Sequence, residues 1–254
     1  MEKMETTSAT PKPRKKNRIK KVLRFLLYGI SSLIIIITLF YWGWILSGSN
    51  KWKLDIDRNG VKIYSLKFPG SRVKNFKANF RVNCTMNQII AGLIENEHYE
   101  EDLTDWAPGC VAFKVIDPFN TKSMANTVMY EYKMLPLFSN SEIIMRSQIS
   151  IDKQNKIVCT DVMAYPNRIP LNEGRIRLSH MHNWWKYTPL ENGEFEIDYY
   201  QDVSMGGLFF DLLINFFGAE QNYKYMSEFS EKLNKEKYLK VKYDFVEEWG
   251  INKK

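Results

Sequence analysis

Apolar and polar side chains alternate with a period of two residues along much of the middle of this 254-residue chain. The segment Lys74–Val82 shows the pattern most clearly, with apolar side chains at every even position from 76 to 82. This alternation is typical of a strand that buries one of its faces. Further strands of the same kind are predicted to begin near Val111, Val128, Ile143, Val158, Arg175 and Phe195.

Two shorter strands are predicted between Trp52 and Tyr64. They are divided by Asn59-Gly60, and an Asn-Gly pair is a strong signal for a two-residue hairpin turn. Helical spacing follows in Met86–Ile94, and a second short helix is predicted over Glu95–Trp106. A small helical insert therefore separates the first three strands from the others.

The stretch Met205–Leu233 is predicted to form one long helix. It begins at Gly206-Gly207, a pair suited to a sharp turn of the chain. Apolar residues recur along it at steps of three and four, which defines one stripe: Phe209, Leu212, Phe216, Ala219, Tyr223, Met226 and Leu233. We expect this stripe to pack against the sheet and the polar residues Asp211, Asn215 and Asn222 to face water.

The order of these elements predicts an α+β fold. Six or seven antiparallel strands, interrupted by the helical insert, precede the long final helix. A curved antiparallel β-sheet wrapped around a long C-terminal α-helix is a helix-grip arrangement, and it supplies the concave apolar partner that such a helix needs. The predicted domain covers residues 52–240, after a linker at 47–51 and before a C-terminal extension at 241–254.

One transmembrane helix is predicted ahead of this domain. Phe25–Leu46 contains no charged residue, and as a helix its 22 residues span about 33 Å, which matches a hydrocarbon core of about 30 Å. Residues 1–24 are expected to be a disordered tail, and their excess of Lys and Arg predicts a cytoplasmic N-terminus. The rest of this single-pass protein would then be extracytoplasmic, or periplasmic in a bacterium. A cleaved signal peptide is the alternative, although its apolar part is usually only about 7–15 residues.

The net charge of +7 resides in the N-terminal tail, because residues 25–254 contain equal numbers of basic and acidic side chains. A nucleic-acid partner is therefore not expected. The cysteines Cys84, Cys110 and Cys159 are widely spaced, so no metal or dithiol site is predicted. Buried free thiols are favoured over one disulfide, and no cofactor is expected.

Beyond these patterns, the chain resembles the START (StAR-related lipid-transfer) domain family over about residues 52–240. Its opening, WKLDIDRNGVKIYSLKFPGSRVKNFKANFRV, is similar to the start of that family, with a tryptophan, a G-V-x-[IV]-Y strand and a K-x-F-[KR]-A strand. Val128–Ile149 is similar to the family's strand, proline-containing loop and next strand. Trp185 and Pro189 fall at matching positions of its V-R…W…P segment.

The last helix carries the same resemblance, because Gly206-Gly207, Leu213 and Asn215 fit the opening of the family's final helix. The resemblance implies a cavity between the sheet and this helix that encloses one lipid or other apolar molecule. Each buried CH₂ group contributes about 0.8 kcal/mol, so one acyl chain suffices for useful affinity. The side chains expected to line the cavity are Tyr130, Tyr132, Met145, Ile149 and Tyr199 from the strands, and Phe209, Leu212 and Phe216 from the helix.

His180 and His182 are two residues apart on one predicted strand, and Trp184 follows on the same side. All three are candidate ligand-binding residues, since an imidazole can hydrogen-bond a lipid head group or a sterol hydroxyl. Structural or surface histidines are the alternative. Two histidines do not supply the four ligands of a zinc site, so no metal is predicted. Glu131 and Arg146 have the parity of the outer face, unless a bulge reverses it.

The resulting hypothesis is a membrane-anchored domain that binds a lipid or other hydrophobic molecule for transfer or sensing, without catalysis. The sequence contains no G-x-S-x-G, H-E-x-x-H or phosphate-binding glycine motif. An enzyme of the same superfamily, cyclase- or hydrolase-like and acting on an apolar substrate, is the alternative. A third possibility is an interaction domain whose groove is filled by its own side chains.

Overall fold

The computed structural model describes residues 15–94, 106–133 and 139–249. The chain divides into two units, Met1–Ser47 and Gly48–Lys254. The first unit contains α1 (Lys15–Leu46), a helix that begins inside the segment predicted as a disordered tail. Its section Lys20–Leu46 is long and apolar enough to cross a membrane, and the same length and composition fit a signal sequence.

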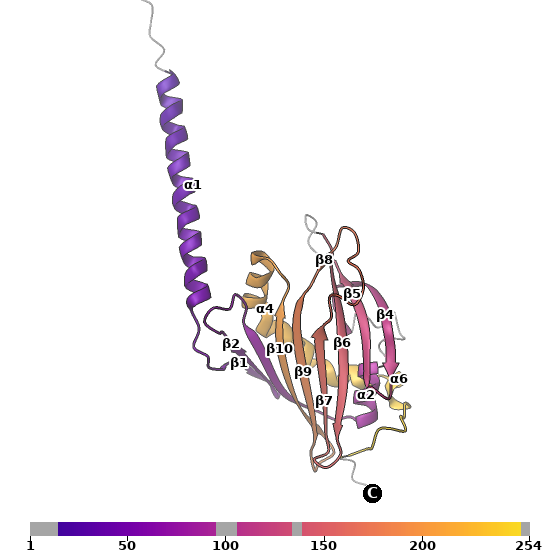
Figure 1. Ribbon diagram of the computed structural model, residues 1–254. Helices are drawn as coiled ribbons and strands as arrows, with labels where there is room; N and C mark the ends of the chain where they lie inside the picture. Colours follow the sequence, from indigo (N-terminus) through magenta and orange to yellow (C-terminus); the bar gives the residue numbers. More distant parts are fainter. Residues whose placement is uncertain (1–14, 95–105, 134–138, 250–254) are drawn as a thin grey trace, which may run out of the picture. The chain divides into compact units, whose positions relative to one another are not determined.

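The second unit is built on one ten-stranded sheet (Figure 1). Its strands are β1 (Lys53–Arg58), β2 (Val61–Leu66), β3 (Asn75–Val82), β4 (Cys110–Asn120), β5 (Ala125–Tyr132), β6 (Ser141–Asp152), β7 (Ile157–Ala164), β8 (Ile176–Arg177), β9 (His180–Pro189) and β10 (Phe195–Ser204). Their order in the sheet is β1-β2-β3-β10-β9-β7-β6-β5-β4, with every neighbouring pair antiparallel, while β8 pairs in parallel with β6 off this path. The predicted α+β class is confirmed, although the number of strands was underestimated.

Local sequence explains the first hairpin. Asn59 and Gly60 join β1 to β2 with φ angles of 52° and 77°, so both central residues of the turn have positive φ. This backbone is that of the type I′ turn, which Asn-Gly favours because neither residue resists positive φ strongly. The predicted two-strand segment is therefore confirmed.

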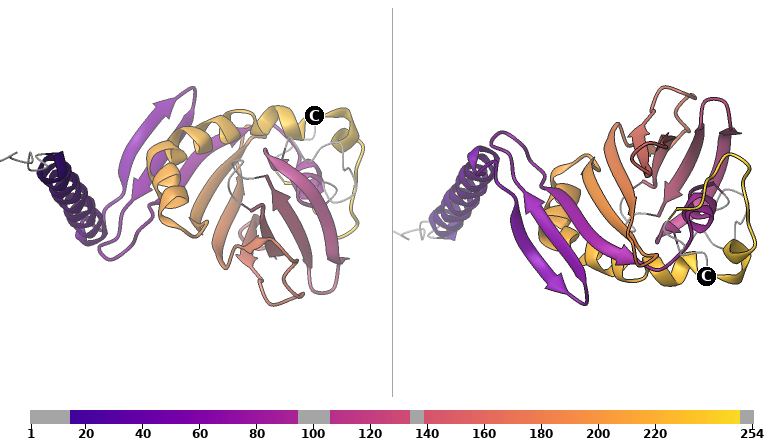
Figure 2. Two further views of the ribbon diagram at one scale, coloured as in Figure 1. Left: turned by 90° about the horizontal axis from the view of Figure 1, so that it is seen from above. Right: turned by 90° about the horizontal axis from the view of Figure 1, so that it is seen from below.

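The helices of this unit are α2 (Met86–Ile94), α4 (Leu208–Ser227), α5 (Phe229–Leu233) and α6 (Glu236–Leu239). α2 agrees with its prediction, whereas the short helix predicted over 95–106 falls mostly outside the described residues. The predicted single helix at 205–233 is wrong in one respect, because it is interrupted at Glu228, the C-cap of α4. Figure 2 shows the sheet curving around α4, so the predicted helix-grip arrangement is confirmed.

The face of α4 that meets the sheet is the polar one. Asp211, Asn215 and Asn222 are only 1%, 8% and 8% exposed, whereas Leu212 and Phe216 are 40% and 77% exposed. The prediction that the polar residues face water is therefore wrong for all three, and the prediction that the apolar stripe faces the sheet is wrong for Leu212 and Phe216 in the first half of this helix.

The reason is a close approach between α4 and the chain that leads into β3. The Asn215 side-chain oxygen accepts a hydrogen bond from the Lys74 backbone N–H (2.9 Å), and its amide donates to the Arg72 carbonyl (2.9 Å). One turn later, Gly218 lies against the Phe76 ring, where a Cβ atom would stand 2.4 Å from a ring carbon. Buried backbone groups need hydrogen-bond partners, and the Asn215 side-chain amide supplies them. Gly218 lets the helix come close enough, which a larger apolar side chain would prevent.

Two hydrophobic clusters fill the concave side of the sheet. The larger one surrounds Trp185 and Phe229, and it includes Trp249 from the segment expected to be an extension. The smaller one surrounds Tyr130 and Ile143. Cys84, Cys110 and Cys159 are all free thiols, but only Cys84 of the three is buried, whereas Cys110 and Cys159 are half-buried.

Candidate functional site

One row of directly paired residues crosses the concave face inside the larger cluster. It runs from β3 to β6 through Ala78, Tyr199, Trp185, Thr160 and Ile149. All five side chains are buried. The inward orientation predicted for Tyr199 and Ile149 is confirmed.

The smaller cluster supplies the other inward tyrosines. Tyr130 stacks on Tyr132 with 6.3 Å between ring centroids, and Phe113 lies 5.1 Å from Tyr130. Met145 packs against the same cluster. Tyr130, Tyr132 and Met145 therefore also face the concave side, in agreement with their predicted orientation.

Between these clusters runs a second row of paired residues, which we call the polar belt. It contains Asn126 of β5, Ser147 of β6, Val162 of β7, Asn183 of β9 and Gln201 of β10. Except for Asn126, these residues are only half-buried. The Asn222 amide of α4 donates a hydrogen bond to the Gln201 side-chain oxygen (2.9 Å), so the helix reaches the belt.

The helix side of the site is aromatic. Phe229 stacks on Trp185 at 5.3 Å, and the Tyr225 ring lies 6.4 Å from Trp185. The Lys232 ammonium stands 4.5 Å from the centre of the Tyr225 ring and pairs with Glu228 at 3.3 Å. An ammonium over an aromatic face is a cation–π contact.

Four phenol groups converge on this region from different elements. Burial raises the pKa values of Tyr132, Tyr187, Tyr199 and Tyr225, and the neighbouring Tyr225 phenol contributes to the higher pKa of both Tyr187 and Tyr199. The Tyr132 phenol acts on Tyr225 in the same way. These four hydroxyls stay neutral at physiological pH and can donate or accept hydrogen bonds.

Several buried polar atoms on this face have no partner among the described residues. They are Thr160 Oγ1, Asn183 Oδ1 and Tyr187 Oη. Tyr187 Oη lies toward Thr160 Oγ1, but the two hydroxyls do not form a hydrogen bond of good geometry. A buried polar group without a partner costs about 1–3 kcal/mol, so such a cluster suggests a place where something else binds.

His180, His182 and Trp184 lie on the opposite, convex face, so their predicted inward orientation is wrong. His180 Nε2 is 2.9 Å from an oxygen of Asp202, and His182 Nε2 is 2.7 Å from an oxygen of Asp161. Strand β9 has bulky residues on both faces, and pairing with its neighbours turns the odd-numbered ones inward. Alternation alone did not distinguish the two faces.

The remaining predicted residues do not join the site as expected. Leu212 and Phe216 point away from the sheet, because Asn215 and Gly218 occupy the contact face of α4. The side chain of Phe209 lies outside the described residues. Glu131 lies opposite Glu142, so it is not the partner of Arg146, and it pairs with Arg175 at 2.8 Å.

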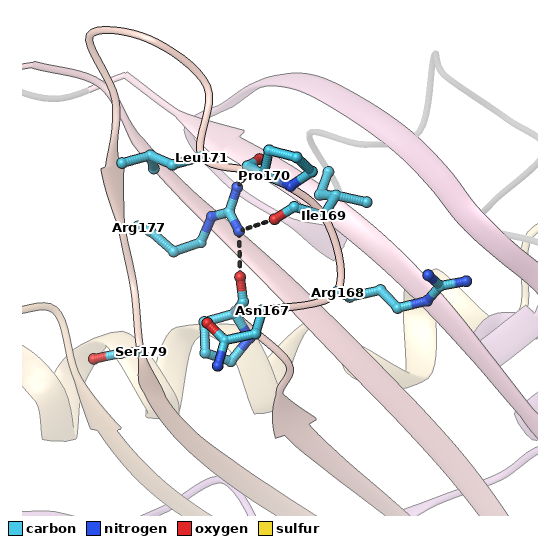
Figure 3. A pocket seen from close by; sticks show the side chains of 8 residues that line it. Asn167, Arg168, Ile169, Pro170, Leu171, Arg177 and Ser179 are labelled. Atoms are coloured by element: carbon cyan, nitrogen blue, oxygen red, sulfur yellow. Dashed lines mark hydrogen bonds between the residues drawn. The ribbon is translucent and has the colours of Figure 1, made fainter.

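The convex face carries a buried ion pair that sequence reasoning missed. Glu142 is fully buried and accepts a hydrogen bond from Arg177 Nε at 2.7 Å. The same guanidinium donates to the carbonyls of Pro166, Ile169 and Pro170, which holds the β7–β8 loop (Figure 3). The available sequence signal for this loop was its two prolines, Pro166 and Pro170, which follow the end of β7. Since its donors are used, Arg177 is a structural clamp on this loop.

The described residues also contain a pocket of about 710 Å³ beside this clamp, lined by residues 166–171 with Arg177 and Ser179 (Figure 3). It opens on the convex side, away from the phenol groups. Within the described parts of the chain, no group of three His, Cys, Asp or Glu side chains could hold a metal ion.

Comparison with known proteins identifies the fold. No protein-family model matches the chain. An uncharacterised protein of Pseudomonas aeruginosa is 24% identical over 169 residues, which cover 65% of this chain and 78% of that protein.

Solved structures are similar over most of the domain. A STAR-related lipid transfer protein from Xanthomonas axonopodis has a TM-score of 0.61 at 18% identity, covering 72% of this chain and 98% of its own. The lipid transfer and protein localization domain of human StarD13 gives 0.58 at 10% identity, covering 74% and 91%. Human StAR-related lipid transfer protein 5 gives 0.52 at 13% identity, covering 83% and 97%. The chain therefore has a START-like fold.

Proposed function

We propose that this protein is a membrane-anchored START-like domain that holds a lipid or another hydrophobic molecule between its concave face and α4, for transfer or sensing. Proteins of the same fold are described as lipid transfer proteins. The observation that carries the proposal is the half-buried polar belt between two hydrophobic clusters. In a solid core, these positions would be as buried as their neighbours in the two clusters.

Tyr132 and Tyr225 support a hollow at this place. Tyr132 packs against the smaller cluster and Tyr225 against the larger one. Both keep some accessible surface, yet both phenol groups are desolvated enough for burial to raise their pKa values. A side chain that keeps accessible surface but is shielded from bulk water is expected on the wall of an enclosed cavity.

The anchor is the apolar part of α1, with the N-terminus in the cytoplasm and the domain outside. An apolar surface on α4, formed by Leu212, Leu213, Phe216 and Phe217, supports contact with the same bilayer. Gly48, two residues after α1 ends, lies tightly against the backbone of Lys67 and Phe68. A few residues later, Arg72 and Lys74 bind Asn215 of α4. The apolar surface is therefore linked, within the domain, to the segment that follows Gly48, where the domain begins.

The domain is proposed to act without catalysis. The candidate general bases His180 and His182 are each bonded to an aspartate on the convex face, away from the phenol groups. A general base must reach the proton that it removes. These two side chains have no access to a molecule held under α4.

Photo-crosslinking of the full chain in phospholipid vesicles tests the proposal. We expect a diazirine-bearing long-chain alcohol to label peptides of β5, β6, β9 and α4 in addition to α1. Val162→Trp, in the belt, should fill the space and abolish the labelling of the domain interior. Met163→Trp, the next residue on the convex face, is the matched control and should not. Labelling confined to α1 and the exposed side of α4 would contradict the proposal.

A further inference from the structure

The chemistry of the inward side chains narrows the ligand class. Along β5, β6, β7, β9 and β10, residues that face the concave side alternate with residues that face outward. Because directly paired residues of neighbouring strands lie on the same face, the strand pairing determines the face of each residue. None of the inward residues on these strands is charged. The charged residues of the same strands, such as Glu131, Asp161 and Lys186, all have the outward parity.

A charged ligand group would therefore have no countercharge on this wall. An ion taken from water into a weakly polar interior costs many kcal/mol unless a partner of opposite charge compensates it. On the helix side, Lys232 touches the Tyr225 ring, but its ammonium is already paired with Glu228. Among the described residues, neither the inward side chains of these strands nor Lys232 offers an uncompensated cation to a phosphate or a carboxylate.

The same wall is rich in uncharged hydrogen-bonding groups. The polar belt contributes two asparagines, a serine and a glutamine, and four phenols belong to the same concave side of the domain. Thr160 Oγ1, Asn183 Oδ1 and Tyr187 Oη lack partners within the described structure. A ligand hydroxyl or carbonyl would complete these hydrogen bonds, and a pure hydrocarbon would leave them unmade.

We propose that the ligand is an uncharged lipid, with a small hydrogen-bonding group such as a hydroxyl or carbonyl at the polar belt and an apolar body that contacts the two hydrophobic clusters on either side of it. This inference rests on the proposed function and adds the class of molecule. The described wall disfavours phospholipids and ionised fatty acids, because it does not compensate a charged group that enters the interior.

Two matched probes test the ligand class with the full chain in phospholipid vesicles: a diazirine-bearing long-chain alcohol and its phosphate monoester. Labelling of α1 reports how much of each probe is in the membrane, so the interior signal, taken from β5, β6 and β9 only, is divided by it. We expect the normalised interior labelling to be at least about tenfold stronger for the alcohol. Equal or stronger interior labelling by the phosphate would overturn the ligand class and leave lipid binding standing. Interior labelling by neither probe would overturn both.

Thr160→Val tests the role of the polar atoms. One lost hydrogen bond corresponds to about a fivefold weaker interior signal from the alcohol. The melting temperature without ligand should not fall, because Thr160 Oγ1 has no protein partner to lose. Thr127→Val is the matched control, since Thr127 Oγ1 is equally buried but faces the convex side, where it lies toward the Asp117 carboxylate and away from the proposed ligand. If both variants label like the wild type, the proposed hydrogen bonds are not made.

Discussion

Replacing Gly218 by alanine tests the orientation of α4 directly. The added Cβ atom would lie 2.4, 2.5 and 3.2 Å from three carbons of the Phe76 ring. Phe76 is buried on the concave face, so its ring cannot swing away freely. Either the helix moves away from β3 or the ring leaves its preferred position.

Two effects of opposite sign determine the magnitude. Alanine in place of glycine stabilises a helix interior by about 1 kcal/mol. Overpacking of a well-packed core costs about 1–3 kcal/mol, and two contacts near 2.5 Å put this site at the upper end. We expect the free energy of unfolding to fall by about 1–2 kcal/mol.

Denaturant unfolding of the full chain in detergent, followed by circular dichroism, measures this change. Phe76→Leu removes ring atoms from the contact, so the double variant should lose less stability than the sum of the two single variants. Gln221→Ala, on the exposed side of α4, controls for helix propensity and should change stability by less than about 0.5 kcal/mol. A gain of about 1 kcal/mol from Gly218→Ala would refute the reasoning, because it would mean that position 218 is not against the sheet.

Three further outcomes are expected. Phe216→Cys carrying an environment-sensitive fluorophore, with Cys110 and Cys159 replaced by alanine, should shift to the blue on reconstitution into vesicles. Leu239→Cys on α6, also exposed in the structure, should not, and equal shifts would contradict membrane contact by α4. Hydrogen bonding from Asn140 and the Arg175 charge lower the pKa of Glu131. Ionised Glu131 therefore stabilises the fold above the unfolded-state pKa near 4.5, and this contribution is lost as pH falls through the lower folded value. Glu131→Gln should lower stability by about 1 kcal/mol at pH 7 in urea titrations, with a difference that shrinks as the pH falls below 4.5, and a difference that does not change with pH would contradict the assignment. Burial raises the pKa of Cys84 to about 12, so a thiol reagent at pH 8 should modify it only after unfolding. Rapid labelling of native Cys84 would show that it is not buried.

The sheet was largely predictable because each of its strands buries one face. Period-two alternation gave the correct orientation of Tyr130, Tyr132, Met145, Ile149 and Tyr199, since a one-residue error would expose a whole row of apolar side chains. The Asn-Gly turn gave the first hairpin for an equally local reason.

The helix and β9 were less predictable because the deciding contacts are distant in sequence. The start of α4 is apolar on nearly every side, so periodicity alone cannot choose its buried face. That choice depends on Asn215 binding backbone groups more than 140 residues away. In β9, Trp184 and Trp185 are adjacent, and only the neighbouring strands determine which ring is inside.

The exposed apolar surface of α4 has a consequence for any version of the protein cut free before Gly48. Removing α1 would not make the remaining domain fully soluble in water, because Phe216 and Phe217 would still expose two large aromatic rings to solvent. Such a fragment should self-associate at high concentration unless detergent or lipid covers these rings. If the proposed membrane contact holds, we expect the fragment to keep an affinity for lipid assemblies after the loss of its anchor.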